Sequence, residues 1–115
     1  MPDPSHLLIA RVHGVAARSA ELREAAQELA DASVKQDGCL GFDVLTVASD
    51  VSELVLLSTW RGDRELRAHF NSGPYGRYVS AVTELLTHPS DVTIHTVSAT
   101  VHPIADLSRE PQRAS

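Results

Sequence analysis

The residues with the clearest capacity for chemistry lie between positions 60 and 78 of this 115-residue chain, and they are Trp60, His69, Tyr75 and Tyr78. An imidazole can exchange a proton near neutral pH, and aromatic rings can stack on a planar ligand. These residue types predict a ligand pocket with one acid–base group. A purely structural alternative stays open, in which the aromatic residues belong to the core and His69 is hydrogen-bonded to the backbone.

Arg11 and His13 add two polar side chains on an expected strand. Side chains of a strand alternate between its faces, so Arg11 and His13 share one face with Ile9. A buried arginine needs an anionic partner or a ligand. We therefore expect Arg11 and His13 to join the pocket if their face is the inward one, and to have no part in it if that face is exposed.

The six histidines raise the question of a metal site. His6 and His13, like His95 and His102, are seven residues apart, an odd spacing that places them on opposite faces of an uninterrupted strand. No expected helix carries two histidines four residues apart, and the sequence has no Gly-rich phosphate loop, nucleophile elbow or cysteine pair. We expect no metal and no bound cofactor, and we interpret the lone Cys39 as a small buried side chain.

The elements that must position these groups follow from the spacing of apolar residues. Alternation predicts strands over 7–13, 39–47, 53–60 and 91–101, and helical spacing predicts helices over 19–37, 63–70 and 75–88. Ser19 and Asp63 are expected to cap helices, and Gly38 to supply a left-handed stop. The resulting order, βαββ(α)αβ, fits an α+β fold of the ferredoxin-like, split βαβ type, with a four-stranded antiparallel sheet and helices on one face.

Composition places these elements in one domain. Apolar residues make up 43% and charged residues 22% of the chain, close to globular averages. We expect a flexible stretch over 1–5, one domain over 6–102, and a polar segment over 103–115 that is either a disordered tail or a dimer arm. The net charge of -5, without a run of Lys or Arg, argues against nucleic acid and membrane partners. The absence of an export signal and the single cysteine indicate a cytoplasmic protein.

A sheet covered by helices on one face only leaves its other face in water. The expected strands carry Val, Leu and Ile on both faces, so that second face is partly apolar. A twofold partner that stacks its own sheet there would bury this surface. We therefore expect a homodimer.

Three stretches carry a resemblance to a known family. They are Gly-Cys-Leu-Gly-Phe over 38–42, Leu-Val-Leu-Leu-Ser-Thr-Trp over 54–60 and Leu-Arg-Ala-His-Phe-Asn-Ser over 66–72, with Tyr78 beyond them. Over about residues 6–100 the chain resembles the antibiotic biosynthesis monooxygenase domain, and Trp60 followed nine residues later by His69 is the most particular shared feature. The resemblance implies a dimeric α+β barrel in which each subunit encloses a pocket between its sheet and its helices.

The resemblance also implies a reaction. Similar members include oxygenases that turn phenols or hydroquinones into quinones with O₂, and they need no metal or flavin because the substrate supplies the electrons. In that case His69 is the expected base, with a pKa near neutral, and Arg11 or His13 would stabilise the phenolate. The expected substrate-binding residues are Trp60, which would stack on the ring, and Phe70, Asn71, Tyr75 and Tyr78.

Departures from the family pattern leave other functions open. The haem-degrading branch uses an Asn, a Trp and an axial His where this chain has Ala10, His69 and Val79, so haem degradation is not expected. The anthrone-oxidising branch has an Asn where this chain has Leu56. The stretch 69–72 is similar to quinol monooxygenases and to a sugar-phosphate isomerase of signal processing. The alternatives are an isomerase or cyclase-like helper with the same pocket, and a non-catalytic ligand-binding dimer of the stress response.

Overall fold

The computed structural model describes residues 4–103. Its elements follow the predicted order: β1 (Ser5–His13), α1 (Ser19–Ser33), β2 (Cys39–Val47), β3 (Asp50–Trp60), α2 (Asp63–Phe70), α3 (Gly73–Val82) and β4 (Asp91–Val97), with 3₁₀ turns over Ala16–Arg18 and Thr83–Leu85. Residues 104–115, which make up nearly all of the predicted tail or arm over 103–115, lie outside the described residues. Residues 1–3 of the predicted flexible start also lie outside them. Ser5 already belongs to β1.

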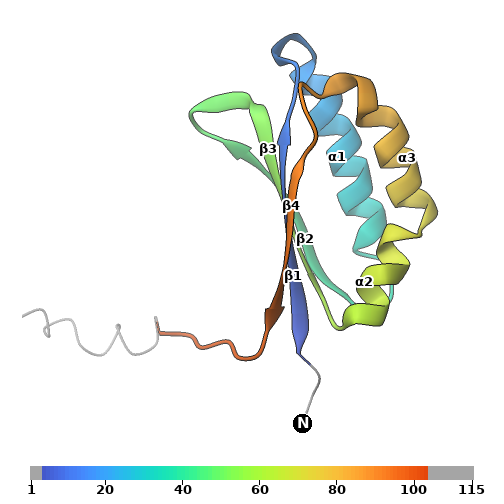
Figure 1. Ribbon diagram of the computed structural model, residues 1–115, viewed down its shortest axis with the longest axis vertical. Coiled ribbons are helices and arrows are strands. Elements are labelled where there is room, and N and C mark those ends of the chain that lie inside the picture. Colours follow the sequence, from blue (N-terminus) through green and yellow to red (C-terminus); the bar gives the residue numbers. More distant parts are fainter. Residues whose placement is uncertain (1–3, 104–115) are drawn as a thin grey trace, which may run out of the picture.

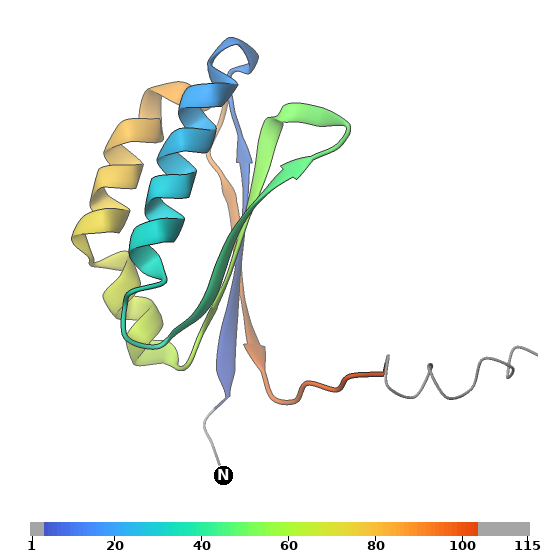
Figure 2. The ribbon, with the colours of Figure 1, turned by 180° about the vertical axis from the view of Figure 1, so that it is seen from behind.

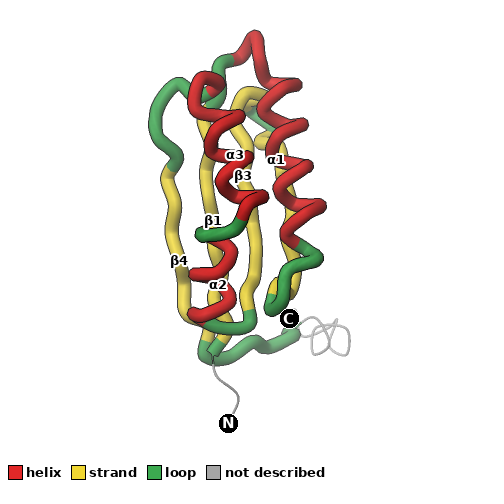
Figure 3. The backbone as a smooth tube through the Cα atoms, turned by 90° about the vertical axis from the view of Figure 1, so that its right-hand side faces the viewer, coloured by secondary structure: helices red, strands yellow, loops and turns green. Residues whose placement is uncertain are grey.

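The strands form one antiparallel sheet in the order β2-β3-β1-β4. The helices lie on one face of this sheet, as the views from front and back show (Figure 1, Figure 2). Figure 3 shows α1 beside α3, with α2 at the end of the layer near the first residues of β1. The predicted α+β fold of ferredoxin-like type is confirmed.

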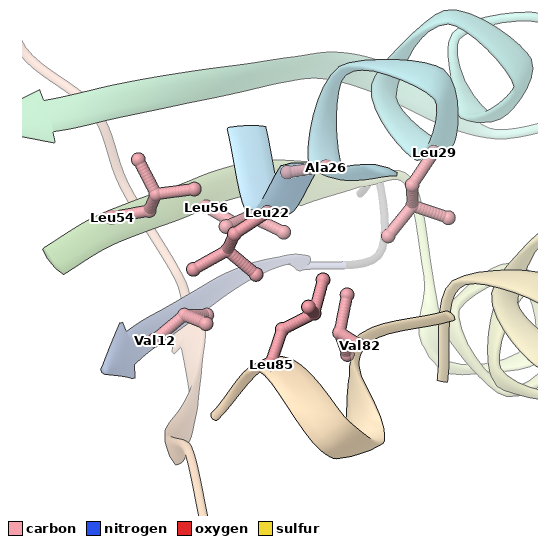
Figure 4. Close-up of a cluster of buried hydrophobic side chains, with 8 residues drawn as sticks. All are labelled: Val12, Leu22, Ala26, Leu29, Leu54, Leu56, Val82 and Leu85. Atoms are coloured by element: carbon pink, nitrogen blue, oxygen red, sulfur yellow. The ribbon is translucent and has the colours of Figure 1, made fainter. Parts of the chain in front are cut away.

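The main core fills the space between the sheet and the helices (Figure 4). This core is built from side chains of β1, β3, α1, the last residue of α3 and the 3₁₀ turn that follows it. Its buried residues are Val12, Leu22, Ala26, Leu29, Leu54, Leu56, Val82 and Leu85. Each buried leucine contributes about 2 kcal/mol relative to exposure. Because Leu8 and Val12 are buried on this side, the predicted alternation of β1 is confirmed, and its helix-facing side is the apolar one.

The helix ends differ in part from the prediction. The turn Ala16–Arg18 runs directly into α1, so Ser19 already has helical backbone angles (φ -62°, ψ -31°) and its side chain does not cap the helix. Asp63 is likewise the first residue of α2 rather than its cap. Ser72 is the observed side-chain cap, and its Oγ accepts from the backbone N–H of Tyr75. The left-handed conformation of Gly38 is confirmed, with φ 82°.

The face of the sheet away from the helices is open in the single chain (Figure 1). Alternation along the paired strands puts its apolar side chains at Leu7, Ile9, Leu45, Val55 and Leu57. Leu45 is 45% exposed, and the other four are partly buried by their strand neighbours. No helix in the described part of the chain is long and apolar enough to cross a membrane.

Candidate functional site

A cavity of about 60 Å³ lies between the sheet and the helices. Its wall is mostly apolar, with Leu8, Leu56, Phe42 and Phe70 among the side chains that form it. The polar side chains in the wall are Ser58, His69, Tyr75, Tyr78 and Ser90. An apolar cavity with a few convergent polar groups is the usual form of a small-molecule site.

His69 lies on the buried side of α2. Leu66 and His69 are three residues apart on this short helix, so they share one face, and both are buried. The imidazole ring is 4.4 Å from the ring of Trp60 and 5.3 Å from that of Tyr75, measured between centroids. The predicted inward position of His69 is therefore observed, and the residue is only 1% exposed.

The hydrogen-bond partner of His69 is a side chain and not the backbone. Nδ1 of His69 lies 3.0 Å from Oε1 of Gln36, in the loop between α1 and β2. The sequence prediction did not include Gln36, because it precedes His69 by 33 residues and lies in a turn without a recognisable motif. The backbone partner for His69 that the purely structural alternative expected is therefore not observed.

Burial changes the charge state expected for His69. Desolvation lowers the pKa of His69 from 6.5 to about 4, because the cationic form loses its hydration inside the protein. The expectation of a pKa near neutral is therefore wrong, and His69 is uncharged at pH 7. A neutral imidazole offers one nitrogen lone pair as an acceptor and one N–H as a donor.

Ser58 is a cavity residue that the sequence prediction missed. Its Oγ accepts a hydrogen bond of 3.0 Å from Nε1 of Trp60, so its own hydroxyl proton is available to a ligand. The sequence does indicate an inward position for Ser58, because alternation along the strand puts it on the same face as the apolar Leu56 and Trp60. A serine among core-facing positions needs a polar partner inside the protein.

Of the predicted substrate-binding residues, Phe70, Tyr75 and Tyr78 line the cavity. Burial raises the pKa of Tyr75, and burial together with the nearby Tyr75 raises that of Tyr78 to about 12, so both phenols stay protonated at neutral pH. Trp60 is fully buried behind His69 and Ser58 and is not part of the cavity wall. Asn71 is exposed at the end of α2, where its Nδ2 donates to the Arg67 carbonyl.

Arg11 and His13 lie on the opposite face of the sheet from His69. The Arg11 side chain is 51% exposed and donates to Oε1 of Glu53 at 2.7 and 3.1 Å. His13 lies 3.3 Å from Asp91 and stacks on His88. The face they share is the open one, so the structure does not bring them to the cavity, and the expectation that they stabilise a phenolate beside His69 is corrected.

Cys39 is partly buried, and desolvation raises the pKa of its thiol. Its Sγ donates to the carbonyl of Gly41 at 3.6 Å. This environment suits a structural side chain rather than a reactive thiolate. Within residues 4–103, no group of three or more His, Cys, Asp or Glu side chains is arranged to hold a metal ion.

Comparison with known proteins places this chain in a family. The family model described as "Antibiotic biosynthesis monooxygenase" matches residues 5–81. The Mycobacterium tuberculosis protein named "Putative monooxygenase Rv0793" is 37% identical over 78 residues, which cover 64% of this chain and 76% of that protein.

Solved structures agree with that match. The structure of Rv0793 from Mycobacterium tuberculosis superposes with a TM-score of 0.79 at 28% identity, over 85% of this chain and 99% of that chain. The structure of PA3566 from Pseudomonas aeruginosa has the same fold, with a TM-score of 0.77 at 23% identity, over 86% and 98% of the two chains. Since the family model covers more than half of the sequence, the chain belongs to the antibiotic biosynthesis monooxygenase family.

Proposed function

We propose that the protein is a monooxygenase that oxidises a phenolic or hydroquinone substrate to a quinone with O₂, without metal or flavin. The family supplies the reaction class. The observation that carries the proposal is the apolar cavity in which the neutral His69 converges with four neutral hydroxyl groups, those of Ser58, Tyr75, Tyr78 and Ser90. A planar ring with one or two hydroxyl groups has the complementary chemistry, because its body is apolar and its edge both donates and accepts hydrogen bonds.

The wall of the cavity favours a neutral substrate. Every side chain described as lining it is uncharged at pH 7, since His69 is neutral and both tyrosines stay protonated. A phosphate or carboxylate buried there would lack a cationic partner and would lose its hydration at a large cost. This argues against the sugar-phosphate isomerase alternative and for a phenol.

In the proposed mechanism His69 accepts the hydrogen bond of a substrate O–H. Full proton transfer from the phenol to His69 in the resting complex is unfavourable. The pKa of a phenol, about 10, is about 6 units above the pKa of His69, so the transfer costs ~8 kcal/mol. The proton moves to His69 as electrons leave the ring toward O₂, since the oxidised phenol is far more acidic. His69 is thus the acceptor that lets deprotonation and oxidation proceed together.

The hydroxyl groups of Ser58, Tyr75 and Tyr78 take the role that was first expected of Arg11 and His13. All three line the cavity, and each can donate to a substrate oxygen on which negative charge develops. A neutral donor in an apolar cavity stabilises such charge without requiring a buried cation.

The reaction balances without an added reductant. A phenol and O₂ give a para-quinone and water: a ring C–H bond breaks, one oxygen atom forms the new carbonyl, and the phenolic oxygen becomes the other carbonyl. The second oxygen atom leaves as water with the phenolic hydrogen and the ring hydrogen. A hydroquinone gives a hydroxyquinone and water with the same balance, because one ring C–H bond becomes C–OH. In both reactions the substrate supplies all four electrons, so the protein needs only to bind the ring and to hold and return a proton.

The size of the cavity limits the part of the substrate that it holds. About 60 Å³ holds a few water molecules, so even one aromatic ring requires side chains to move aside. The wall reaches the solvent along β4, where Val92 is 49% exposed and the neighbouring Ile94 is 51% exposed. A polycyclic substrate would extend over this apolar strip.

The test is quinone formation by the metal-stripped protein from a panel of hydroquinones and anthrones under O₂. The wild type is expected to exceed the buffer rate, and His69→Ala to lose most of that gain. His102→Ala is the matched control, because His102 is an exposed histidine beyond the end of β4. Equal rates for the wild type, His69→Ala and buffer across the panel would end the oxygenase proposal.

The low pKa of His69 is equally consistent with the ligand-binding alternative. A histidine with a pKa of about 4 holds little proton at pH 7, which suits an acceptor in a binding site as well as a base. In that case the same quinols would quench the fluorescence of Trp60, which lies directly behind His69, without any quinone being formed.

We further propose that the protein is a homodimer through its open sheet face. The apolar centre of this face, including Val55 and Leu57, is flanked by the ion pair of Arg11 and Glu53, as expected for a surface with an apolar core and a polar rim. Light scattering should give twice the 12.4 kDa of one chain. Leu57→Glu should dissociate the dimer and Ser80→Glu, on the exposed side of α3, should not; a monomeric wild type at micromolar concentration would refute the proposal.

A further inference from the structure

His69 separates two spaces in the molecule. On its inner side is the cavity described above. On its outer side is a surface hollow of about 290 Å³ between the α1–β2 loop and α2, lined by Gln36 and Ser72 among others. Gln36 belongs to the outer hollow only, whereas His69 belongs to both walls, and the bond between Nδ1 and Gln36 Oε1 therefore holds the imidazole from outside the cavity.

We propose that Gln36 is a positioning residue for His69, which fixes the imidazole as the tautomer with its proton on Nδ1 and leaves Nε2 as the acceptor for the ligand. An amide oxygen only accepts hydrogen bonds, so the ring nitrogen that faces it must donate. Of the two ring nitrogens, only Nε2 then remains for a ligand. The identity of that ligand as a phenol rests on the proposed function, but the tautomer does not.

The loop that carries Gln36 is held on both sides. The backbone N–H of Gln36 donates to the Ser33 carbonyl at 2.9 Å, and its carbonyl accepts from Cys39 at 3.2 Å. Gly38, in its left-handed conformation, ties the loop to the end of β3 through a 2.7 Å bond from the N–H of Arg61 to its carbonyl. The amide of Gln36 is therefore presented from a fixed backbone and not from a free surface chain.

The imidazole is held as firmly as the amide. Rings of Trp60 and Tyr75 pack against it, and the carbonyl of His69 accepts from both the N–H and the hydroxyl of Ser72. A half-turn of the ring would place a C–H group against Gln36 and leave a polar atom without its partner, at a cost of about 1–3 kcal/mol. Packing and hydrogen bonding thus select the same ring orientation.

The chemistry of an amide at this position differs from that of a carboxylate. An amide orients the ring without favouring its cationic form, whereas a carboxylate would favour the imidazolium. Ion pairs join Arg61 to Asp37 and Glu65 at 3.0 and 3.1 Å, and no described acidic group pairs with His69. The titratable and charged groups around His69 on the neighbouring elements are Asp37, Arg61, Arg64, Glu65, Tyr75 and Tyr78.

The direct test is nuclear magnetic resonance of the full chain with ¹⁵N-labelled histidine, which reports which ring nitrogen carries the proton. His69→Gln assigns the signals of His69 among the six histidines. In the wild type we expect a protonated Nδ1 and an unprotonated Nε2. Gln36→Met should lose the single tautomer, and Gln36→Glu should raise the titration midpoint of His69 by about one to three pH units.

The matched control is Gln27→Met, because Gln27 is an exposed glutamine of α1 that bonds only Asp31 in the described structure. It should leave the His69 signals unchanged. Quinol turnover should fall in Gln36→Met and stay at the wild-type rate in Gln27→Met. A proton on Nε2 in the wild type, or an unchanged tautomer in Gln36→Met, would overturn the role of Gln36. If the wild type oxidises no quinol, the proposed function fails. The position of the proton on the His69 ring, measured by nuclear magnetic resonance, still tests the role of Gln36.

Discussion

His69 should make the protein less stable as the pH falls from 7 toward 4.5. Because burial lowers the pKa of His69 from 6.5 to about 4, the unfolded chain takes up a proton in a range where the folded protein does not. Protonation therefore stabilises the unfolded state below pH 6.5, and the loss is complete only below pH 4. A shift of about 2.5 units corresponds to about 3 kcal/mol in all, of which about 2 kcal/mol is lost by pH 4.5.

Urea unfolding at the two pH values measures this loss. Trp60 is the one tryptophan of the chain, it is fully buried, and its ring lies 4.4 Å from the imidazole, so its fluorescence reports unfolding next to the titrating group. His69→Gln removes the titration, and His102→Gln makes the same change at an exposed histidine outside the sheet. Protein concentration must be equal throughout, because any association contributes to the measured stability.

The comparison between variants isolates His69, since all other titrating groups are shared. Between pH 7 and 4.5 the wild type and His102→Gln should each lose about 2 kcal/mol more than His69→Gln. Equal losses in the wild type and His69→Gln would mean that the folded protein accepts a proton on His69 as readily as the unfolded chain. The argument from burial, and with it the neutral His69 of the proposed mechanism, would then be refuted.

Two further predictions concern stability, both measured by urea unfolding. Ser58→Ala should lower the unfolding free energy by about 1–3 kcal/mol, because the fully buried Nε1 of Trp60 loses its acceptor; an unchanged value would mean that another group accepts this bond. Gly38→Ala should cost roughly 1–3 kcal/mol, since φ is 82° and the added methyl would meet the Glu65 side chain. Gly76→Ala, where nothing lies within 4 Å in α3, should instead stabilise by about 0.5–1 kcal/mol, and a similar effect at both glycines would contradict this reasoning.

The fold followed from the sequence because its signals are local. Strand β2 has the predicted bounds, and the alternation of β1 gave the correct division of its side chains. Which face of β1 points inward depends on tertiary packing. The sequence could therefore predict Arg11 in the pocket only on the condition that its face is the inward one. The more apolar set of Leu8, Ala10 and Val12 was the better indicator of the inward face, because a charged side chain is rarely buried.

The site was less predictable because its decisive features join distant parts of the chain. The position of His69 on the buried side of α2 could be predicted, since it depends on helical spacing alone. Its pKa could not, because desolvation requires the packing of Trp60, Tyr75 and Phe42 around the ring. The contact with Gln36 depends on how the α1–β2 loop returns to the sheet, which no local pattern encodes.

The two faces of the sheet divide the chemistry of the molecule. On the open face, the charge of Arg11 is compensated by Glu53, and His13 lies beside Asp91. On the helix side, the cavity offers an acceptor at His69 and hydroxyl donors, with no full charge in the described wall. A neutral site of this kind binds a phenol without first ionising it, and it can stabilise an anion only as that anion forms. The same desolvation that makes His69 a poor base in the resting state therefore favours a reaction in which the proton leaves only when the electrons do.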